Sequence, residues 1–224
     1  RTDADRTGRG DRDDAMTLVL NNLLHGLLSL SGLGGESMIR DLGWKFMEAG
    51  RRIERGIHVG VLVGSALGTE RSAPVESLVA ESVLSASESI ITSRRRYRSL
   101  AFASATVELL FDDRTNPRSL RYQIDRLADL VAPLESPVGS MSPAERLLDE
   151  LTELLEETDL ANLAATDELG HRRELERFVN AVRADLSAIS ETIAAESFIR
   201  PRSQHSMLGT IEQVRPLDRS GPAT

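Results

Sequence analysis

Apolar residues recur at intervals of three and four positions along most of the chain, and this spacing predicts amphipathic helices. They are densest between Ala15 and Leu30, which predicts a buried helix that ends in the glycine-rich sequence at 31–35. The residues from Ser37 to Leu67 are predicted to form one long helix. Its core-facing stripe consists of Ile39, Leu42, Phe46, Ala49, Ile53, Ile57, Gly60, Gly64 and Leu67.

The other side chains of this long helix fall on two further lines. The line opposite the apolar stripe is predicted to face solvent, and its Glu48 and Arg52 form a favourable pair one turn apart. That line consists of Asp41, Lys45, Glu48, Arg52 and Arg55. A third line, on the shoulder between the two faces, consists of Trp44, Met47, Arg51, Glu54 and His58. Glycines at 50, 56, 60 and 64 each cost a helix about 1 kcal/mol relative to Ala, so they predict close approach of a neighbouring helix.

Further helices are predicted downstream. One begins near residue 75 and continues toward residue 110, and the last runs over about 167–196. Asn116 and Pro117 are predicted to start another helix as its N-cap and first position. A second start is predicted where Ser142 caps and Glu145 completes a capping box.

The composition favours helices packed on helices, because aromatic residues make up only 4% of the 224 residues while Leu, Ala, Glu, Arg and Ser dominate. We therefore expect an all-α fold, an antiparallel bundle of about five to six helices over residues 15–198. Residues 1–14 are expected to be a disordered lead-in, and residues 199–224 an extended or disordered tail.

Charge and cysteine content limit which cellular compartment and which binding partners are expected. The absence of cysteine favours a reducing cytoplasm, and the apolar runs are judged too short for a membrane span. The net charge of −8 argues against nonspecific binding of nucleic acid. No motif for nucleotide binding or for a catalytic nucleophile is present, so no cofactor is expected in this chain.

The candidate chemistry centres on Glu54 and Arg55. Adjacent helical residues diverge by about 100°, so the two side chains cannot simply pair with each other. Glu54 is expected to reach Arg51 or His58, whereas Arg55 points to water or to another helix. One interpretation is a structural ion pair between helices, and another is a cleft that binds a polar or peptide-like ligand. A metal site on Glu54 and His58 is disfavoured, because it needs three or four ligands.

Four arginines also cluster within the sequence SRRRYRS at 93–99. They could bind phosphate or carboxylate groups, or they could form a solvated turn that faces a partner. Because successive helical residues fan around the axis, they cannot all face one ligand.

Three stretches of the chain resemble the bacterial alpha-E domain, a helical family named for a Glu-Arg motif. They are MIRDLGWKFMEAGRRIERGIHV at 38–59, ESIITSRRRYRS at 88–99 and LLFDDRTNPRSLRYQIDRL at 109–127. The family usually opens with another helix bearing its own Glu-Arg pair, which is not found here, so the chain is expected to be the C-terminal part of a longer fused protein. Residues that match the motifs include Trp44, Gly50, Arg51, Glu54, Arg55, Arg96, Tyr97, Arg98, Asn116, Pro117 and Arg118.

The resemblance implies an association with circularly permuted ATP-grasp domains, fused or acting in trans, and with transglutaminase-like proteins. Such systems are inferred to make or modify peptides by ATP-dependent amide ligation, so ATP and Mg are implied for a linked domain only. The leading hypothesis is an accessory domain that binds a peptide-like or acidic substrate or docks the ligase. Alternatives are a small amide-forming or amide-cleaving enzyme that uses Glu54, and a purely structural interaction module.

We expect the binding residues to share a polar cleft. The residues proposed for it are Arg51, Glu54, Arg55, His58, Arg96, Tyr97, Arg98 and Arg118.

Overall fold

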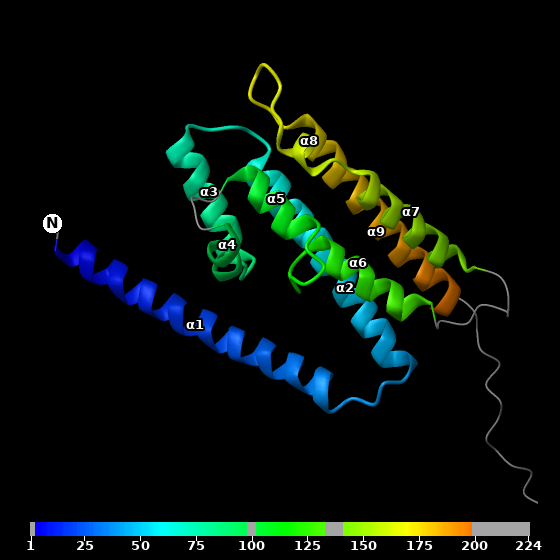
Figure 1. Cartoon of the computed structure of the whole chain (residues 1–224). Helices are drawn as coiled ribbons and strands as arrows, with labels where there is room; N and C mark the ends of the chain where they lie inside the picture. Colours follow the sequence, from blue (N-terminus) through cyan, green and yellow to red (C-terminus); the bar gives the residue numbers. More distant parts are fainter. Residues whose placement is uncertain (1–2, 98–101, 133–140, 199–224) are drawn as a thin grey trace, which may run out of the picture.

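The computed structural model describes residues 3–97, 102–132 and 141–198, and these parts of the chain form nine helices and no strand. The all-α class is thereby confirmed. At the centre lies α2 (Leu42–Leu67), which packs along α6 (Leu120–Val131) and α9 (Arg173–Phe198). Figure 1 shows α2 running through the bundle with these helices beside it.

The bundle is larger than five to six helices mainly because the single helix predicted over 75–110 is divided into three. These are α3 (Ala73–Ala86), α4 (Ile90–Tyr97) and α5 (Ala103–Phe111). The break after α3 occurs at Glu88, whose φ of 50° belongs to the left-handed region. That conformation stops the helix and turns the chain toward α4.

The next two helix starts can be compared with their predicted caps. α6 begins at Leu120, and its N-cap is Ser119, whose hydroxyl accepts a hydrogen bond from the Tyr122 N–H. The prediction of Asn116 as N-cap is therefore wrong. Asn116 is buried in the preceding loop, where its amide donates to the Ser89 hydroxyl and to the Leu109 carbonyl.

The capping box predicted for the following helix is confirmed. α7 (Pro143–Glu157) begins with the reciprocal hydrogen bonds of Ser142 and Glu145. The short α8 (Leu160–Ala164) then leads through a turn to α9, and α7 and α9 pack on each other.

Glycines of α2 permit close packing, as predicted, but only at some positions. A Cβ atom on Gly56 would lie 2.9 Å from Cδ1 of Leu186 in α9. A Cβ on Gly64 would lie 3.3 Å from the methyl groups of Val179 in the same helix. Gly50 is different, because nothing lies within 4 Å of a Cβ built there.

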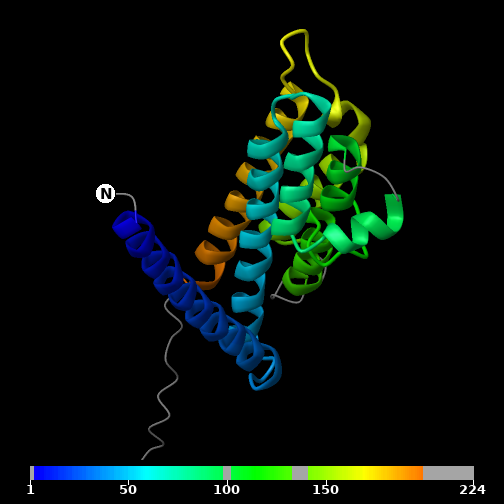
Figure 2. The ribbon, with the colours of Figure 1, turned by 90° about the vertical axis from the view of Figure 1, so that its left-hand side faces the viewer.

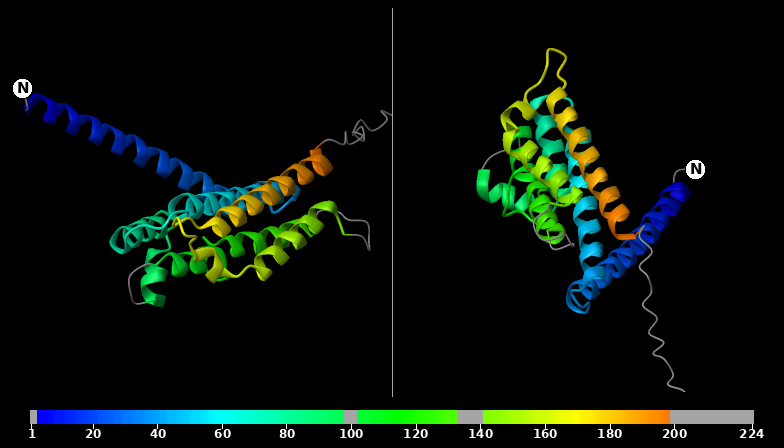
Figure 3. Two further views of the ribbon diagram at one scale, coloured as in Figure 1. Left: turned by 90° about the horizontal axis from the view of Figure 1, so that it is seen from above. Right: turned by 90° about the vertical axis from the view of Figure 1, so that its right-hand side faces the viewer.

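The first helix differs most from the sequence expectation. α1 (Asp3–Glu36) includes most of the predicted lead-in and continues through the glycine-rich sequence at 31–35, so it ends six residues past the expected end of the buried helix at Leu30. Figure 2 and Figure 3 show it leaving the bundle as a separate arm, joined to the rest through the turn into α2. No other described helix packs along it.

The apolar side chains of α1 are consequently exposed, not buried as predicted. Ten of them retain between 52% and 66% of their accessible surface: Met16, Leu18, Val19, Leu20, Leu23, Leu24, Leu27, Leu28, Leu30 and Leu33. The span Asp14–Glu36 is also long and apolar enough to cross a membrane by length and composition, with none of its window buried. The expectation that no run reaches that length therefore does not hold for this helix.

Candidate functional site

The candidate site lies at the elbow where α1 turns into α2. The indole N–H of Trp44 donates to the carbonyl of Gly34 over 3.1 Å, and the Arg40 guanidinium lies 4.3 Å from the centre of the indole ring. Asp41 caps α2 by accepting a hydrogen bond from the Trp44 N–H. Gly34 is buried, and its lack of a side chain leaves room for Met47 and Arg51. These contacts hold the end of α1 against the first turns of α2.

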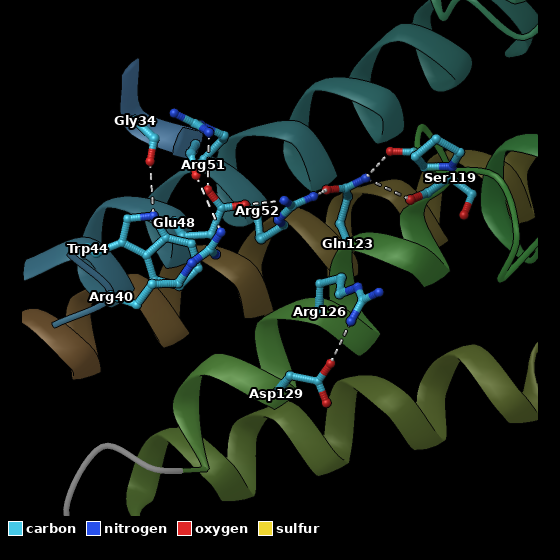
Figure 4. A network of polar contacts seen from close by, with 12 residues as sticks. Gly34, Arg40, Trp44, Glu48, Arg51, Arg52, Ser119, Gln123, Arg126 and Asp129 are labelled. Atoms are coloured by element: carbon cyan, nitrogen blue, oxygen red, sulfur yellow. Dashed lines mark hydrogen bonds and ion pairs between the residues drawn. The ribbon is translucent and has the colours of Figure 1, made fainter. Parts of the chain in front are cut away.

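Behind the elbow, Glu48 organises a buried polar network. Only 7% of its surface is exposed, and its carboxylate pairs with Arg51 at 3.1 Å and with Arg52. Arg52 also donates to the side-chain oxygen of Gln123 over 3.2 Å, and Gln123 in turn donates to the Pro117 carbonyl over 2.7 Å. Figure 4 shows this chain of contacts running from α2 to α6, with the separate hydrogen bond between Trp44 and Gly34 of α1 beside it. The network fixes both arginines.

The sequence identified the Glu48–Arg52 pair correctly but placed it on a solvated face. The pair is buried because α6 packs on that side of α2. Arginines stand three and four residues after Glu48, and this spacing is the sequence signal that could have identified Glu48 as the shared partner of two arginines.

A cavity of about 490 Å³ lies between the two arms of the elbow. Its walls come from the C-terminal part of α1, from the turn and from α2. The lining residues are Leu27, Leu30, Ser31, Leu33, Gly34, Met38, Met47, Arg51 and Arg55. Five apolar side chains and two guanidinium groups thus face one space.

Arg55 contributes the electrostatic character of this cavity. Partial burial lowers the pKa of Arg55, and the positive charges of Arg52, Arg118 and Arg51 lower it further. Within the described part of the chain, Arg51 and Arg52 share Glu48, and Arg118 pairs with Glu88, whereas no ion pair is formed by Arg55. Positive charge therefore exceeds negative charge here, which favours an anionic ligand.

Glu54 and His58 lie outside the cavity. Both are exposed, and neither forms a hydrogen bond or an ion pair within the described residues. The expected contact of Glu54 with Arg51 is not formed, because Arg51 pairs with Glu48 instead. Among the described residues, Glu54 therefore has no hydrogen-bond or ion-pair partner that would position its carboxylate for acid–base chemistry.

Arg96 and Tyr97 belong to a second cluster beside the loop that follows α5. Arg96 pairs with Asp113 at 2.8 Å, and its pKa is raised chiefly by the hydrogen bond with Tyr97. Burial raises the pKa of Tyr97, with Glu108 adding to the effect. For Asp113, burial acts to raise the pKa, but hydrogen bonds from Thr115 and the charge of Arg96 outweigh it, so the pKa is lowered.

The structure thus places the predicted site residues in different surroundings. Arg51 and Arg55 line the cavity and Arg118 acts on Arg55 through its charge, whereas Arg96 and Tyr97 form the separate cluster. Arg98 lies outside the described residues. Among the described residues, no group of three or more His, Asp or Glu side chains could hold a metal ion.

Two buried cations, Arg121 and Arg172, were missed by the sequence analysis. Arg172, which is 5% exposed, pairs with Glu76 at 2.6 Å and donates to the carbonyls of Leu67 and Ala164. It joins the end of α2 to α3, α8 and the start of α9. No periodic pattern in the sequence distinguishes it from its neighbour Arg173.

Comparison with known proteins places these features in a family. The chain is 35% identical over 199 residues to uncharacterized proteins of Mycobacterium bovis and of two strains of Mycobacterium tuberculosis. The match covers 89% of this chain but only 22% of each relative, so the chain spans about a fifth of their length. No solved structure matches.

The sequence model of one family matches residues 3–198, which is nearly all of the described chain. That family is described as a predicted alpha-helical domain with a conserved ER motif, and the resemblance assigns this motif to Glu54 and Arg55. The match gives no support to the expectation that the chain is the C-terminal part of a longer fused protein. On the extent of this match, the chain belongs to the Alpha-E family.

Proposed function

We propose that this chain is an accessory binding domain of a cytoplasmic, ATP-grasp-linked system that ligates or modifies peptides, and that it holds an acidic, peptide-like substrate in the α1–α2 cavity. The observation that carries the binding role is the combination of apolar walls with two guanidinium groups in one space. A ligand that fits has an apolar side chain against Leu27, Leu30 and Met47 and a carboxylate against Arg55.

The ligation chemistry belongs, in this proposal, to a linked ATP-grasp domain that binds ATP and Mg. Its presence, fused or in trans, and the participation of transglutaminase-like proteins come from the family resemblance and not from the geometry. The matched part is only 22% of the length of the relatives, so the rest of each relative is long enough to contain such domains. This chain would then present the substrate.

The experiment that tests binding uses the single tryptophan, Trp44, which contacts the wall of the cavity at Gly34. Titration with the dipeptide N-acetyl-Leu-Glu should change its fluorescence, and N-acetyl-Leu-Gln amide should bind at least tenfold more weakly because it carries no charge. Arg55→Gln should weaken binding of the acid by about tenfold, equivalent to about 1.4 kcal/mol.

The control for that substitution is Arg95→Gln, which changes an exposed arginine of α4 remote from the cavity lining. It should bind the acid as the unsubstituted chain does. Equal binding of acid and amide, or an equal loss in both variants, would refute an anion site at Arg55.

A docking role, the other part of the leading hypothesis, is favoured by a different observation. α1 extends from the bundle with ten large apolar side chains exposed, which is the kind of surface through which proteins associate. No observation favours the alternative in which Glu54 acts as an acid or base.

A further inference from the structure

Four arginines gather where the loop before α6 meets α2, and they are Arg51, Arg52, Arg55 and Arg118. Gly56 directly follows Arg55, and a Cβ built on it would lie 3.5 Å from Cδ1 of Leu120. Leu120 lies two residues after Arg118, so Arg55 and Arg118 flank this contact. Burial lowers the pKa of Arg55 most, and the charges of Arg52 and Arg118 lower it further.

The side chain of Gln123 fixes the loop before α6 against α2. Its oxygen accepts a hydrogen bond from Arg52 over 3.2 Å. Its nitrogen donates to the carbonyls of Pro117 over 2.7 Å and of Ser119 over 3.4 Å. Figure 4 shows Gln123 between Arg52 and Ser119. Arg118, the residue between the two carbonyls, is thereby held beside α2.

Two of the four arginines are already committed to a buried partner. Arg51 and Arg52 both pair with Glu48, whose side chain is only 9% exposed. Drawing either arginine away would leave charge unpaired in a largely buried position, which is costly. A ligand is therefore left with Arg55 and Arg118.

Arg55 and Arg118 are accessible to an anion in different ways. Within the described part of the chain, no ion pair is formed by Arg55. Arg118 pairs with Glu88, but 38% of the Arg118 side chain and 70% of the Glu88 side chain are exposed. Such an ion pair contributes little, because water screens both charges. A carboxylate of a ligand can therefore take the place of Glu88.

We propose that the ligand of the cavity carries two carboxylates, one bound by Arg55 and one that replaces the carboxylate of Glu88 on Arg118. This inference rests on the proposed function and specifies its substrate class, a peptide that ends in a dicarboxylic residue such as glutamate. Glu88 is then an internal competitor for the second carboxylate. A ligand with one carboxylate leaves the pair between Arg118 and Glu88 intact.

The positions of the two guanidinium groups favour two carboxylates over a single dianion such as phosphate. Arg55 lines the cavity, whereas Arg118 lies outside its lining. A ligand seated in the cavity therefore meets Arg55 first and reaches Arg118 only with a group that extends past it. One small dianion would need both guanidinium groups on the same oxygen atoms.

Peptides that differ by one carboxylate test this inference in the Trp44 fluorescence titration. N-acetyl-Leu-Glu should bind about fivefold more tightly than N-acetyl-Leu-Gln, which keeps only the C-terminal carboxylate. Arg118→Gln should abolish this difference and leave the affinity for N-acetyl-Leu-Gln unchanged. The matched control is Arg114→Gln, in the same loop with a side chain that is 60% exposed, and it should preserve the difference.

Glu88→Gln tests the exchange of carboxylates, because it frees Arg118 in advance. It should strengthen binding of N-acetyl-Leu-Glu by about threefold, as expected for removal of an exposed ion pair, and leave N-acetyl-Leu-Gln unaffected. The gain should disappear when Glu88→Gln is combined with Arg118→Gln. Glu54→Gln, which removes an exposed negative charge next to Arg55, is the control and should give no gain.

The outcomes separate this inference from the proposed function. Equal affinity for the two peptides, with the loss in Arg55→Gln retained, would overturn the second carboxylate and leave the proposed function standing. An equal gain from Glu54→Gln would overturn the exchange, because it would show a general effect of charge. Complete competition by inorganic phosphate would show a single dianion site instead. If neither peptide binds, the proposed function and this inference both fail.

Discussion

Glu54 and Arg55 are adjacent in the sequence, but only Arg55 lines the cavity, while Glu54 is exposed on another side of α2. The carboxylate that orders the neighbouring arginines is Glu48, which lies two helical turns before Arg55 and is buried. The acidic and basic members of the motif therefore have separate roles. In the structure, the motif is not an ion pair.

This separation predicts unequal effects of removing the two carboxylates. Glu48→Gln should lower the free energy of unfolding by about 2 kcal/mol, because it leaves Arg51 and Arg52 without their shared partner in a largely buried position. Glu54→Gln should change it by less than about 0.5 kcal/mol, as expected for an exposed side chain. Urea denaturation of both variants measures the difference, and equal losses would mean that the environments of these two residues are misassigned.

Arg172 is predicted to be an arginine whose loss strongly destabilises the bundle. Arg172→Met should lower the free energy of unfolding by about 3 kcal/mol, because Glu76 and the carbonyls of Leu67 and Ala164 would lose their donor. The adjacent Arg173, whose side chain is 52% exposed, offers a matched control in Arg173→Met. The control substitution should lower the free energy of unfolding by less than about 1 kcal/mol. A comparable loss in both variants would contradict the role of the buried Arg172 in joining these helices.

Helical periodicity was enough to predict the fold class and the buried face of α9. For the long helix predicted from Ser37 it was only partly right, because Ile39 precedes α2 and is 82% exposed, whereas Val59 and Val63 are buried. The Ser142–Glu145 capping box and the Glu48–Arg52 pair could also be predicted, because both depend on residues within one turn of each other. Asn116 was misread for a related reason. Asn before Pro satisfies the local rule for a helix start, but the amide of this asparagine donates to Ser89, 27 residues away, and to Leu109, seven residues away, and both lie beyond the one turn that the rule considers.

The candidate site could be predicted only in part. Arg51 and Arg55 were singled out from the sequence. The cavity itself depends on the contact of Gly34, near the end of α1, with Met47 of α2, and a contact between separate helices could not be predicted. The exposure of Leu20 and Leu27 was not predictable either. Periodicity shows that a helix has an apolar face but not whether that face meets the same chain or another one.

The glycines of α2 provide a paired prediction. Gly50→Ala should stabilise the protein by up to about 1 kcal/mol, because the helix gains propensity and the new methyl group meets no neighbour. Gly56→Ala should destabilise it by about 1 kcal/mol or more, because its methyl group would lie 2.9 Å from Leu186 and force the core to move. Thermal denaturation of the two variants compares them directly. Stabilisation by both substitutions would mean that the side chain of Leu186 can move away from the new methyl group without lowering the stability of the core.

The pH dependence of stability should show the effect of ionising Asp185, which lies on α9 near Glu150 of α7. Burial raises the pKa of Asp185 above 3.8, and the negative charge of Glu150 raises it further. Since the folded protein then holds a proton more tightly than the unfolded chain, the contribution of this group to stability is full below pH 3.8 and is lost as the pH rises through the raised value. Ionised Asp185 therefore weakens the folded state at neutral pH.

Asp185→Asn removes this ionisation and should raise the melting temperature at pH 7, with little or no gain at pH 3, where the aspartic acid is already neutral. Glu150→Gln should produce part of the same gain, because it removes the secondary cause of the shift and leaves the burial. Asp149→Asn, an exposed position next to Glu150, serves as the control for a general loss of negative charge. An equal gain for Asp185→Asn at both pH values would show that packing of the amide, and not the charge of Asp185, is responsible.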